Sequence, residues 1–463
     1  MGRWRRPLSA RGKAIAFLAT MLLLSGCATN PTAVVSSTPS TSIAQHETAS
    51  TDITESSTVS AVMTNGEIKA ALCAVDENAP KEWKLIQTVV KKQSNCFGPT
   101  RYVNASMSNL PATDFRSIDI SKCRVENVNN YPRLGFTSGE FYDKKKFPAP
   151  NKVLQIIPIY TNDANPSRTP LEDYGQYFSF LKNWVENTSD LGESIEIRIP
   201  NKYFYFDGYL SDYPGIERHQ MYTDAGGKFV DDVMGSVDSL IDFSSVDATM
   251  MIVPPETDNQ LLGTNGWSGT KSDYDGNKVM VNFIQTPIDL INNEQDWQVN
   301  FTNPFTMLHE MHHGGLDYGD HVDEMGPYGL MGAQLTNLLA WEKWVSGFIS
   351  DSQVACVDPN SSNTIAIAAS ETDSGNRKMV VLPISRTNLI VIESQRAIGY
   401  NYKLPDYATG VVVYRIDLTK TNHGEGEYLL TDPSLKAGQS ITVDGIIISV
   451  DVASNLYDIV SIN

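Results

Sequence analysis

Residues 153–160 read VLQIIPIY, a mostly apolar run with the length of a β-strand. An apolar run without alternation is typical of a strand that is buried on both faces. Residues 169–172 follow and read TPLE, which predicts a helix with Thr169 as N-cap, Pro170 at the first helical position and Glu172 closing a capping box. A buried strand followed by a capped helix indicates an α/β protein.

The same alternation continues along the chain. Apolar residues at helical spacing predict a second helix over residues 229–241, which leads into an apolar strand at residues 249–253. Asp275-Gly276 predicts a tight turn before a further strand over residues 279–284. We therefore expect an α/β (α+β) domain with a twisted mixed sheet.

The pattern changes towards the C-terminus. Apolar residues over 335–345 predict one more amphipathic helix. Beyond it come short strand-like runs, such as residues 389–393, 411–416 and 446–452, separated by Gly, Asn, Pro and Asp. Residues 351–463 are therefore predicted to form an all-β domain resembling a β-sandwich.

The N-terminus has the three-part plan of a secretory signal: basic residues, an apolar run over residues 14–24, and the sequence Ser25-Gly26-Cys27. The small residues before the cysteine resemble the bacterial lipoprotein cleavage box. This implies a lipoprotein signal peptide over residues 1–26 and a lipid-modified Cys27 that anchors the chain to the membrane. A plain secretion signal is the alternative. We expect an exported protein, held on the outer face of a bacterial membrane or released extracellularly.

Two further regions precede the α/β domain. Residues 28–64 hold 17 Ser or Thr and no aromatic, Lys or Arg, which predicts a flexible tether over residues 27–64. Residues 65–145 contain no chemical motif and are expected to be an accessory or pro-region. The α/β domain is assigned to residues 146–350.

Composition excludes several classes of protein. The 463 residues are 41% hydrophobic, which is typical of a globular chain. With 36 Lys or Arg against 54 Asp or Glu, the formal charge of -18 has the wrong sign for a nucleic-acid partner. Nothing in the sequence sets the oligomeric state. Four cysteines besides Cys27 allow up to two disulfides in three connectivities: Cys73, Cys96, Cys123 and Cys356.

The chemistry is concentrated at residues 309–313, which read HEMHH, an instance of H-E-x-x-H. On a helix, residues four apart differ by about 40°, so His309 and His313 can bind one cation. Glu310 then lies beside the metal as a general base that accepts a proton from water. His312 points about 60° away from His309, which favours a position behind the ligands or on the surface over that of a ligand. The set predicts zinc and peptide-bond hydrolysis.

A catalytic zinc site needs a third protein ligand. Gly314-Gly315 ends the predicted helix and lets the chain turn back, so Asp317 is favoured. Asp320 and His321 remain alternatives. Glu342, further along the chain, is a third alternative, although it is expected to be a solvated helix residue.

These residues resemble the immune inhibitor A family of secreted bacterial zinc metallopeptidases, which are metzincins. Residues 308–320 look like the family's H-E-x-x-H-x-x-G-L-x-D-x-Y-D with two residues missing. Residues 326–332, GPYGLMG, are similar to its Gly-Pro-Trp-Asp-Leu-Met-Gly segment, and residues 390–417 resemble its β-rich tail. The resemblance implies a metzincin-like catalytic domain, with Met331 in the turn beneath the metal.

By the same resemblance, His309, His313 and Asp317 match zinc ligands and Glu310 matches the general base. The expected substrate is a protein or peptide. The acidic residues near Asp317 are also of the type that binds calcium, although no EF-hand pattern is present. The alternative function is a cell-surface binding or adhesin lipoprotein on a metallopeptidase fold whose metal site is degenerate.

Overall fold

A computed structural model describes the chain from residue 109 onward, with gaps. The described ranges are 109–128, 134–136, 152–163, 165–191, 195–213, 224–254, 256–257, 267–283, 308–309, 311–312, 321–322, 324–333, 336–372, 375–401, 404–422 and 424–463. The predicted signal peptide, tether, Cys27, Cys73 and Cys96 lie outside these residues. In the described part, no helix is both long and apolar enough to cross a membrane.

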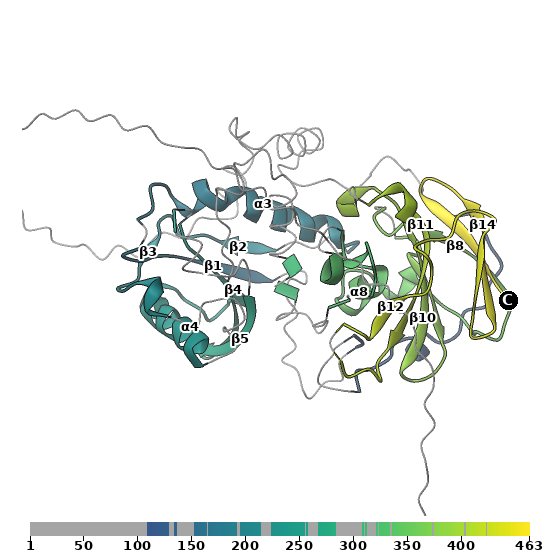
Figure 1. The fold of residues 1–463 in the computed structure, drawn as a ribbon, viewed down its shortest axis with the longest axis horizontal. Coiled ribbons are helices and arrows are strands. Elements are labelled where there is room, and N and C mark those ends of the chain that lie inside the picture. The colour runs from purple at the N-terminus through teal and green to yellow at the C-terminus, as the bar shows by residue number, and fades with distance from the viewer. Residues whose placement is uncertain are drawn as a thin grey trace, which may run out of the picture. The chain divides into compact units, whose positions relative to one another are not determined.

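A mixed sheet forms the first part of the described chain (Figure 1). Its strands are β1 (Val153–Tyr160), β2 (Glu196–Arg198), β3 (Phe204–Tyr205), β4 (Ala248–Ile252), β5 (Trp267–Tyr274) and β6 (Asn277–Phe283). The order is β2-β1-β4-β6-β5, with β3 paired to the end of β1. All pairings are parallel except that of β5 with β6. The predicted α/β class with a mixed sheet is confirmed.

Helix α3 (Pro170–Thr188) begins as its sequence predicts. The Thr169 hydroxyl accepts a hydrogen bond from the Glu172 amide at 3.3 Å, and the Glu172 carboxylate accepts one from the Thr169 amide at 2.8 Å. This capping box satisfies two amides that a helix start otherwise leaves unpaired. Tyr174 and Phe178 of α3 then pack in one core cluster with Ile156 of β1.

The other face of the sheet is covered by α4 (Asp224–Val237), which includes most of the predicted second helix. Phe229 and Val233 of α4 share a core cluster with Ile157 and Ile159 of β1. Successive residues of β1 thus point to opposite buried faces, which explains its continuous apolar sequence. The predicted turn at Asp275-Gly276 is confirmed, with both residues at positive φ.

Two sheets form the C-terminal part (Figure 1). The first has the order β12-β11-β10-β9-β7 and the second the order β13-β14-β15-β8. The strands are β7 (Val354–Cys356), β8 (Asn363–Ala368), β9 (Met379–Pro383), β10 (Asn388–Gln395), β11 (Gly410–Asp417), β12 (Glu427–Leu429), β13 (Ser440–Val443), β14 (Ile446–Ala453) and β15 (Tyr457–Ile462). Pairing is antiparallel except between β7 and β9. The predicted change to β structure is confirmed.

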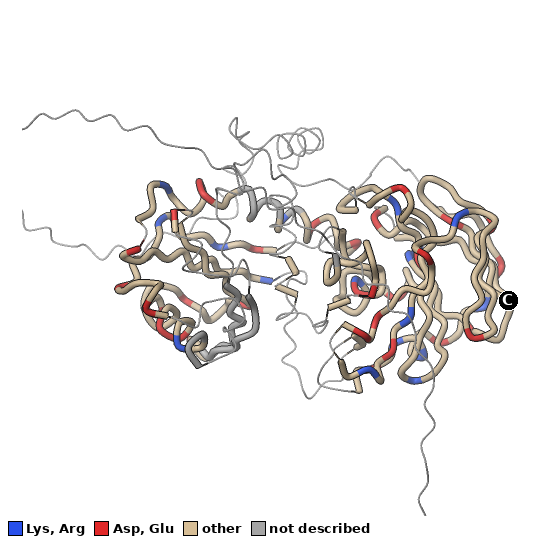
Figure 2. Tube along the Cα trace, viewed as in Figure 1, with Lys and Arg blue, Asp and Glu red and all other residues tan. Residues whose placement is uncertain are grey.

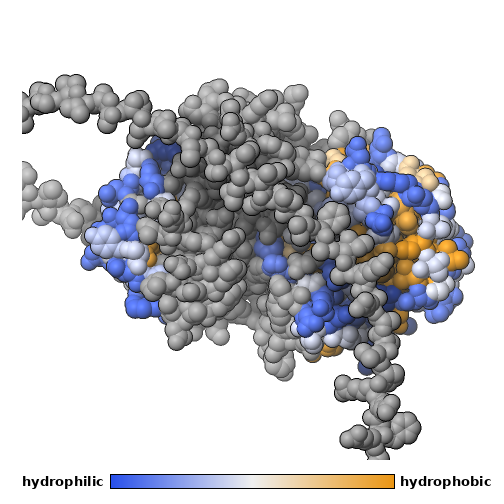
Figure 3. Space-filling model, in the orientation of Figure 1, coloured by the Kyte–Doolittle hydropathy of each residue, from blue (hydrophilic) through white to orange (hydrophobic). Residues whose placement is uncertain are grey.

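The two C-terminal sheets share one core. Ile390 and Val413 from the first sheet lie in the same apolar cluster as Ile367, Ile448 and Val460 from the second. On the face drawn in Figure 3, polar residues dominate the described surface of the α/β part, whereas apolar residues gather over the C-terminal strands. Acidic and basic residues are interspersed along the described chain in both parts (Figure 2).

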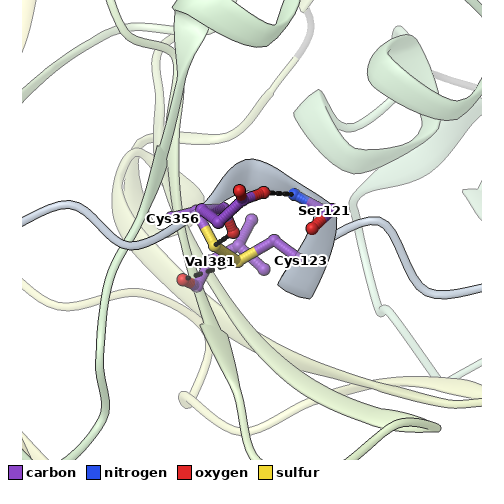
Figure 4. Close-up of a disulfide and its surroundings, with 5 residues drawn as sticks. Ser121, Cys123, Cys356 and Val381 are labelled. Atoms are coloured by element: carbon purple, nitrogen blue, oxygen red, sulfur yellow. Dashed lines mark hydrogen bonds between the residues drawn. A yellow bond between two sulfur atoms is a disulfide. The ribbon is translucent and has the colours of Figure 1, made fainter.

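A segment from the predicted accessory region packs on these sheets. The Ile118 amide donates to the Cys356 carbonyl at 2.9 Å, and the Trp341 indole donates to the Leu134 carbonyl at 2.7 Å. Cys123 and Cys356 form a disulfide, with Val381 of β9 beside it (Figure 4). Of the possible connectivities, the structure therefore selects one that joins this segment covalently to the C-terminal part. The predicted domain boundaries stay predictions.

The predicted helix over residues 335–345 is shorter than expected. Helix α8 covers Ala340–Val345, and all six of its residues are buried, so the expected amphipathic pattern is wrong. Glu342 on this helix is held by the amide of Leu339 just before it, and Lys343 by Glu371 from another segment. The remaining short helices are η1 (Ile120–Lys122), η2 (Leu210–Asp212), η4 (Asp238–Leu240), η6 (Gly329–Ala333), η7 (Asp351–Gln353), η8 (Gly399–Asn401) and η9 (Asp406–Ala408).

Candidate metal centre

His309, the first histidine of the motif, lies in a buried helical stretch. Its neighbours Leu308 and Met311 belong to the core cluster that α3 and the sheet share. The side chain of His309 is 1% exposed, and its Nδ1 donates to the Leu330 carbonyl at 3.0 Å. Because a carbonyl oxygen only accepts, this bond holds the proton on Nδ1 and leaves the lone pair on Nε2. A histidine oriented in this way is suited to bind a metal through Nε2.

His312 points into the core. Its Nδ1 donates to the Leu308 carbonyl at 2.7 Å, and its ring stands edge-on to Trp184 of α3 with 5.4 Å between ring centres. The side chain is fully buried, which excludes the surface position and leaves the other predicted one, behind the ligands. The motif helix packs against α3 here, which turns the face that includes His312 away from solvent.

The π-helical turn η6 lies further along the chain than the motif, and Met331 of this turn is fully buried among Val322, Leu339 and Trp341. Such burial is expected both for an ordinary core residue and for a methionine in the turn beneath a metal ion. The Met331 carbonyl accepts a hydrogen bond from the Val322 amide at 3.3 Å.

His321 lies against His309. The two ring centres are 4.8 Å apart and the ring planes are at 85°. His321 is partly exposed, whereas His309 is buried. The structure thus brings together one histidine of the motif and one of the three alternatives for the third ligand.

The remaining predicted site residues, Glu310, His313, Asp317 and the alternative Asp320, lie outside the described residues. Among the residues that are described, no three His, Cys, Asp or Glu side chains form a group that could hold a metal ion. The complete predicted ligand set therefore stays a prediction. The orientation of His309 is the observed feature that fits a zinc ligand.

Glu342 is not the solvated residue that the sequence suggested. It is fully buried on α8, and its carboxylate accepts a hydrogen bond from the Leu339 amide at 2.5 Å. Glu393 of β10 is buried close by and accepts hydrogen bonds from the Ala340 amide and the Tyr414 hydroxyl. Glu342 is buried because α8 lies against the first C-terminal sheet.

The two carboxyl groups have raised pKa values. Burial raises the pKa of Glu342 to about 8, with a further contribution from the nearby Glu393. Burial also raises the pKa of Glu393 to about 7, although hydrogen bonds from Gln395, Ala340 and Tyr414 and the charge of Lys343 act in the opposite direction. The folded chain therefore retains protons here that an unfolded chain would release.

Glu342→Gln is expected to make the stability less dependent on pH. In the unfolded chain this carboxyl titrates near its ordinary pKa of 4.5, whereas in the folded chain it titrates near 8. As the pH rises between these values, the free energy of unfolding of the wild type falls by up to ~1.4 kcal/mol per pH unit for such a group. Gln has no proton to lose and still offers an oxygen to the Leu339 amide. Denaturant unfolding from about pH 5 to 8 should therefore show a smaller slope in the variant.

The matched control is Glu126→Gln, which changes an exposed carboxyl. It should keep the wild-type dependence on pH. Identical slopes for Glu342→Gln and the wild type would contradict the assignment of a protonated buried carboxyl.

Sequence reasoning missed the groups that orient the site. The Leu330 carbonyl and the Met331 carbonyl are main-chain atoms, and every residue type has a main-chain carbonyl, so the sequence does not reveal their role. The aromatic partner of His312, Trp184, is separated from it by more than a hundred residues. The buried charges around α8 gave no signal, since Glu and Lys in a helix are typical of a solvated face.

A scan against models of protein families finds no family that matches the chain, and no curated protein matches its sequence.

Proposed function

We propose that this protein is an exported, lipid-anchored zinc metalloendopeptidase with a metzincin-like catalytic domain and a C-terminal β-sandwich-like domain. The observation that carries the proposal is the hydrogen bond from His309 Nδ1 to the Leu330 carbonyl. Metal-binding histidines are typically oriented by such a bond from the ring nitrogen that does not bind the metal. The motif H-E-x-x-H and its resemblance to the immune inhibitor A family add to this support.

The residues divide into ligands and a base. His309 and His313 would hold the zinc ion, together with a third ligand from residues 317–321, for which the sequence favours Asp317. Zinc, when bound, supplies Lewis-acid chemistry that polarises a peptide carbonyl and lowers the pKa of water. The carboxylate of Glu310 accepts a proton from the attacking water and later delivers it to the leaving amine.

The surroundings of His309 hold it firmly in place. Leu308 and Met311 anchor the motif helix in the core, so His309 is placed by packing as well as by its hydrogen bond. A rigidly supported ligand costs little reorganisation during the reaction. The disulfide Cys123–Cys356 fits the oxidising compartment that the signal sequence implies.

Removal of the metal tests the proposal. The purified mature chain should contain one zinc per molecule and should hydrolyse casein or a peptide library. The chelator 1,10-phenanthroline should abolish this hydrolysis and added zinc should restore it, because the attacking water is not activated without the metal. The matched control is 1,7-phenanthroline, an isomer that does not chelate, which should leave hydrolysis unchanged.

His309→Ala should lose both zinc and hydrolysis. If the wild-type chain binds zinc at full occupancy but hydrolyses no substrate, the alternative function, a binding or adhesin lipoprotein, is favoured. Hydrolysis by zinc-free preparations of the wild-type chain would contradict the proposal.

A further inference from the structure

One short segment, the turn η6, contacts both His309 and the residue after His321. The Leu330 carbonyl accepts from His309 Nδ1, and the next carbonyl, that of Met331, accepts from the amide of Val322. Val322 directly follows His321 in the chain. Two successive carbonyls of the turn η6 therefore hold the ring of His309 and the backbone next to His321.

Glycines make this close approach possible. A Cβ atom on Gly332 would lie 2.9 Å from the Val322 carbonyl oxygen, which is closer than side-chain carbons come to backbone atoms. A Cβ on Gly329, which has φ +83°, would lie 3.1 Å from a methyl group of Val322. The turn thus has the shape that lets the chain after His321 sit directly on it.

The ring separation matches that of two imidazoles on one metal ion. With zinc–nitrogen bonds of about 2.0–2.1 Å and tetrahedral angles, two imidazole ligands have ring centres about 5 Å apart. The observed separation is 4.8 Å, and the rings are nearly perpendicular. The Nδ1 bond of His309 leaves its lone pair on Nε2, the nitrogen that a shared cation would use.

We propose that His321 binds the same zinc ion as His309, in place of Asp317. This inference rests on the proposed function, since it presumes that the motif binds zinc. It changes the chemistry of the site, because three neutral imidazoles leave the full charge of the metal ion uncompensated, whereas Asp317 would neutralise part of it. It also separates this chain from the pattern of the family that it resembles.

The number of imidazoles around zinc tests this assignment without any substitution. X-ray absorption of the zinc-loaded wild-type chain should show three histidine ligands. Two histidines with a carboxylate oxygen would overturn the assignment of His321 and leave the proposed function standing. A chain that binds no zinc would overturn both.

Affinity measurements give a second test. In competition with a chromophoric chelator, His321→Ala should bind zinc more than about 100-fold more weakly than the wild type, beyond the 10–100-fold typical of losing a residue that only orients a ligand. Asp317→Ala is the matched variant and should bind zinc within about 10-fold of the wild type. The reverse order of the two losses would overturn the proposal. Circular dichroism shows whether each variant remains folded.

Discussion

Glu310→Gln should abolish most hydrolysis while the zinc ion stays bound. Gln has the same shape as Glu but cannot accept the proton of the attacking water or deliver one to the leaving amine. General acid–base catalysis typically contributes 10²–10⁴-fold, so we expect kcat/KM for a peptide substrate to fall by roughly that factor. Zinc content and substrate hydrolysis, measured on the same preparation, check the prediction.

Glu324→Gln provides the matched control, since Glu324 is an exposed glutamate on the segment that leads into the turn η6. It should retain wild-type hydrolysis. If Glu310→Gln hydrolyses peptides as fast as the wild type, another group acts as the base and the assigned mechanism is wrong.

Lys343→Met should strongly destabilise the fold. Lys343 of α8 forms an ion pair with Glu371, and both side chains are 2% exposed. Glu371 also accepts hydrogen bonds from the Asn337 side chain and the Tyr400 amide. These donors are neutral, so the charge that balances the carboxylate comes from Lys343. Removal of one partner of a buried ion pair leaves an uncompensated charge and typically costs about 3–5 kcal/mol. Denaturant unfolding at pH 7 should show a loss of this size.

The double variant Lys343→Met, Glu371→Gln separates the charge from the packing. Gln keeps an oxygen for the Asn337 and Tyr400 donors but carries no charge, so the double variant should be more stable than Lys343→Met alone. Equal stabilities would mean that the loss in Lys343→Met comes from packing, and would contradict a role for the ion pair.

Hydrogen bonds through Asn337 link the ion pair to helix α3. Asn337, which donates to Glu371, accepts a hydrogen bond from the indole of Trp184 on α3. The ring of Trp184 also packs edge-on against that of His312 in the motif helix. A variant that weakens the ion pair is therefore expected to loosen the packing around the motif helix as well.

Local features of this fold could be predicted because a few neighbouring residues determine them. Thr169, Pro170 and Glu172 specify a helix start through their own hydrogen bonds and dihedral preferences, and the structure has that start. The bounds of β1 match the apolar run at residues 153–160 for a similar reason: burial on both faces requires apolar side chains on both. The predicted helix over residues 335–345 is longer than the observed one. Apolar residues at helical spacing cannot be distinguished from a buried non-helical segment that leads into a helix.

The sequence by itself determined the order of the α/β and β parts, the capped helix α3 and the residue types of the candidate metal centre, all of which depend on short-range patterns. Only the tertiary structure decided that the ring of His309 is held by the Leu330 carbonyl, that His321 lies against it, and that Glu342 is buried beside Glu393. Each of these depends on segments that are not adjacent in the chain and meet through packing of apolar surfaces. Hydrophobic burial is not directional, so a pattern of apolar residues predicts that segments will pack without predicting which polar groups they bring together.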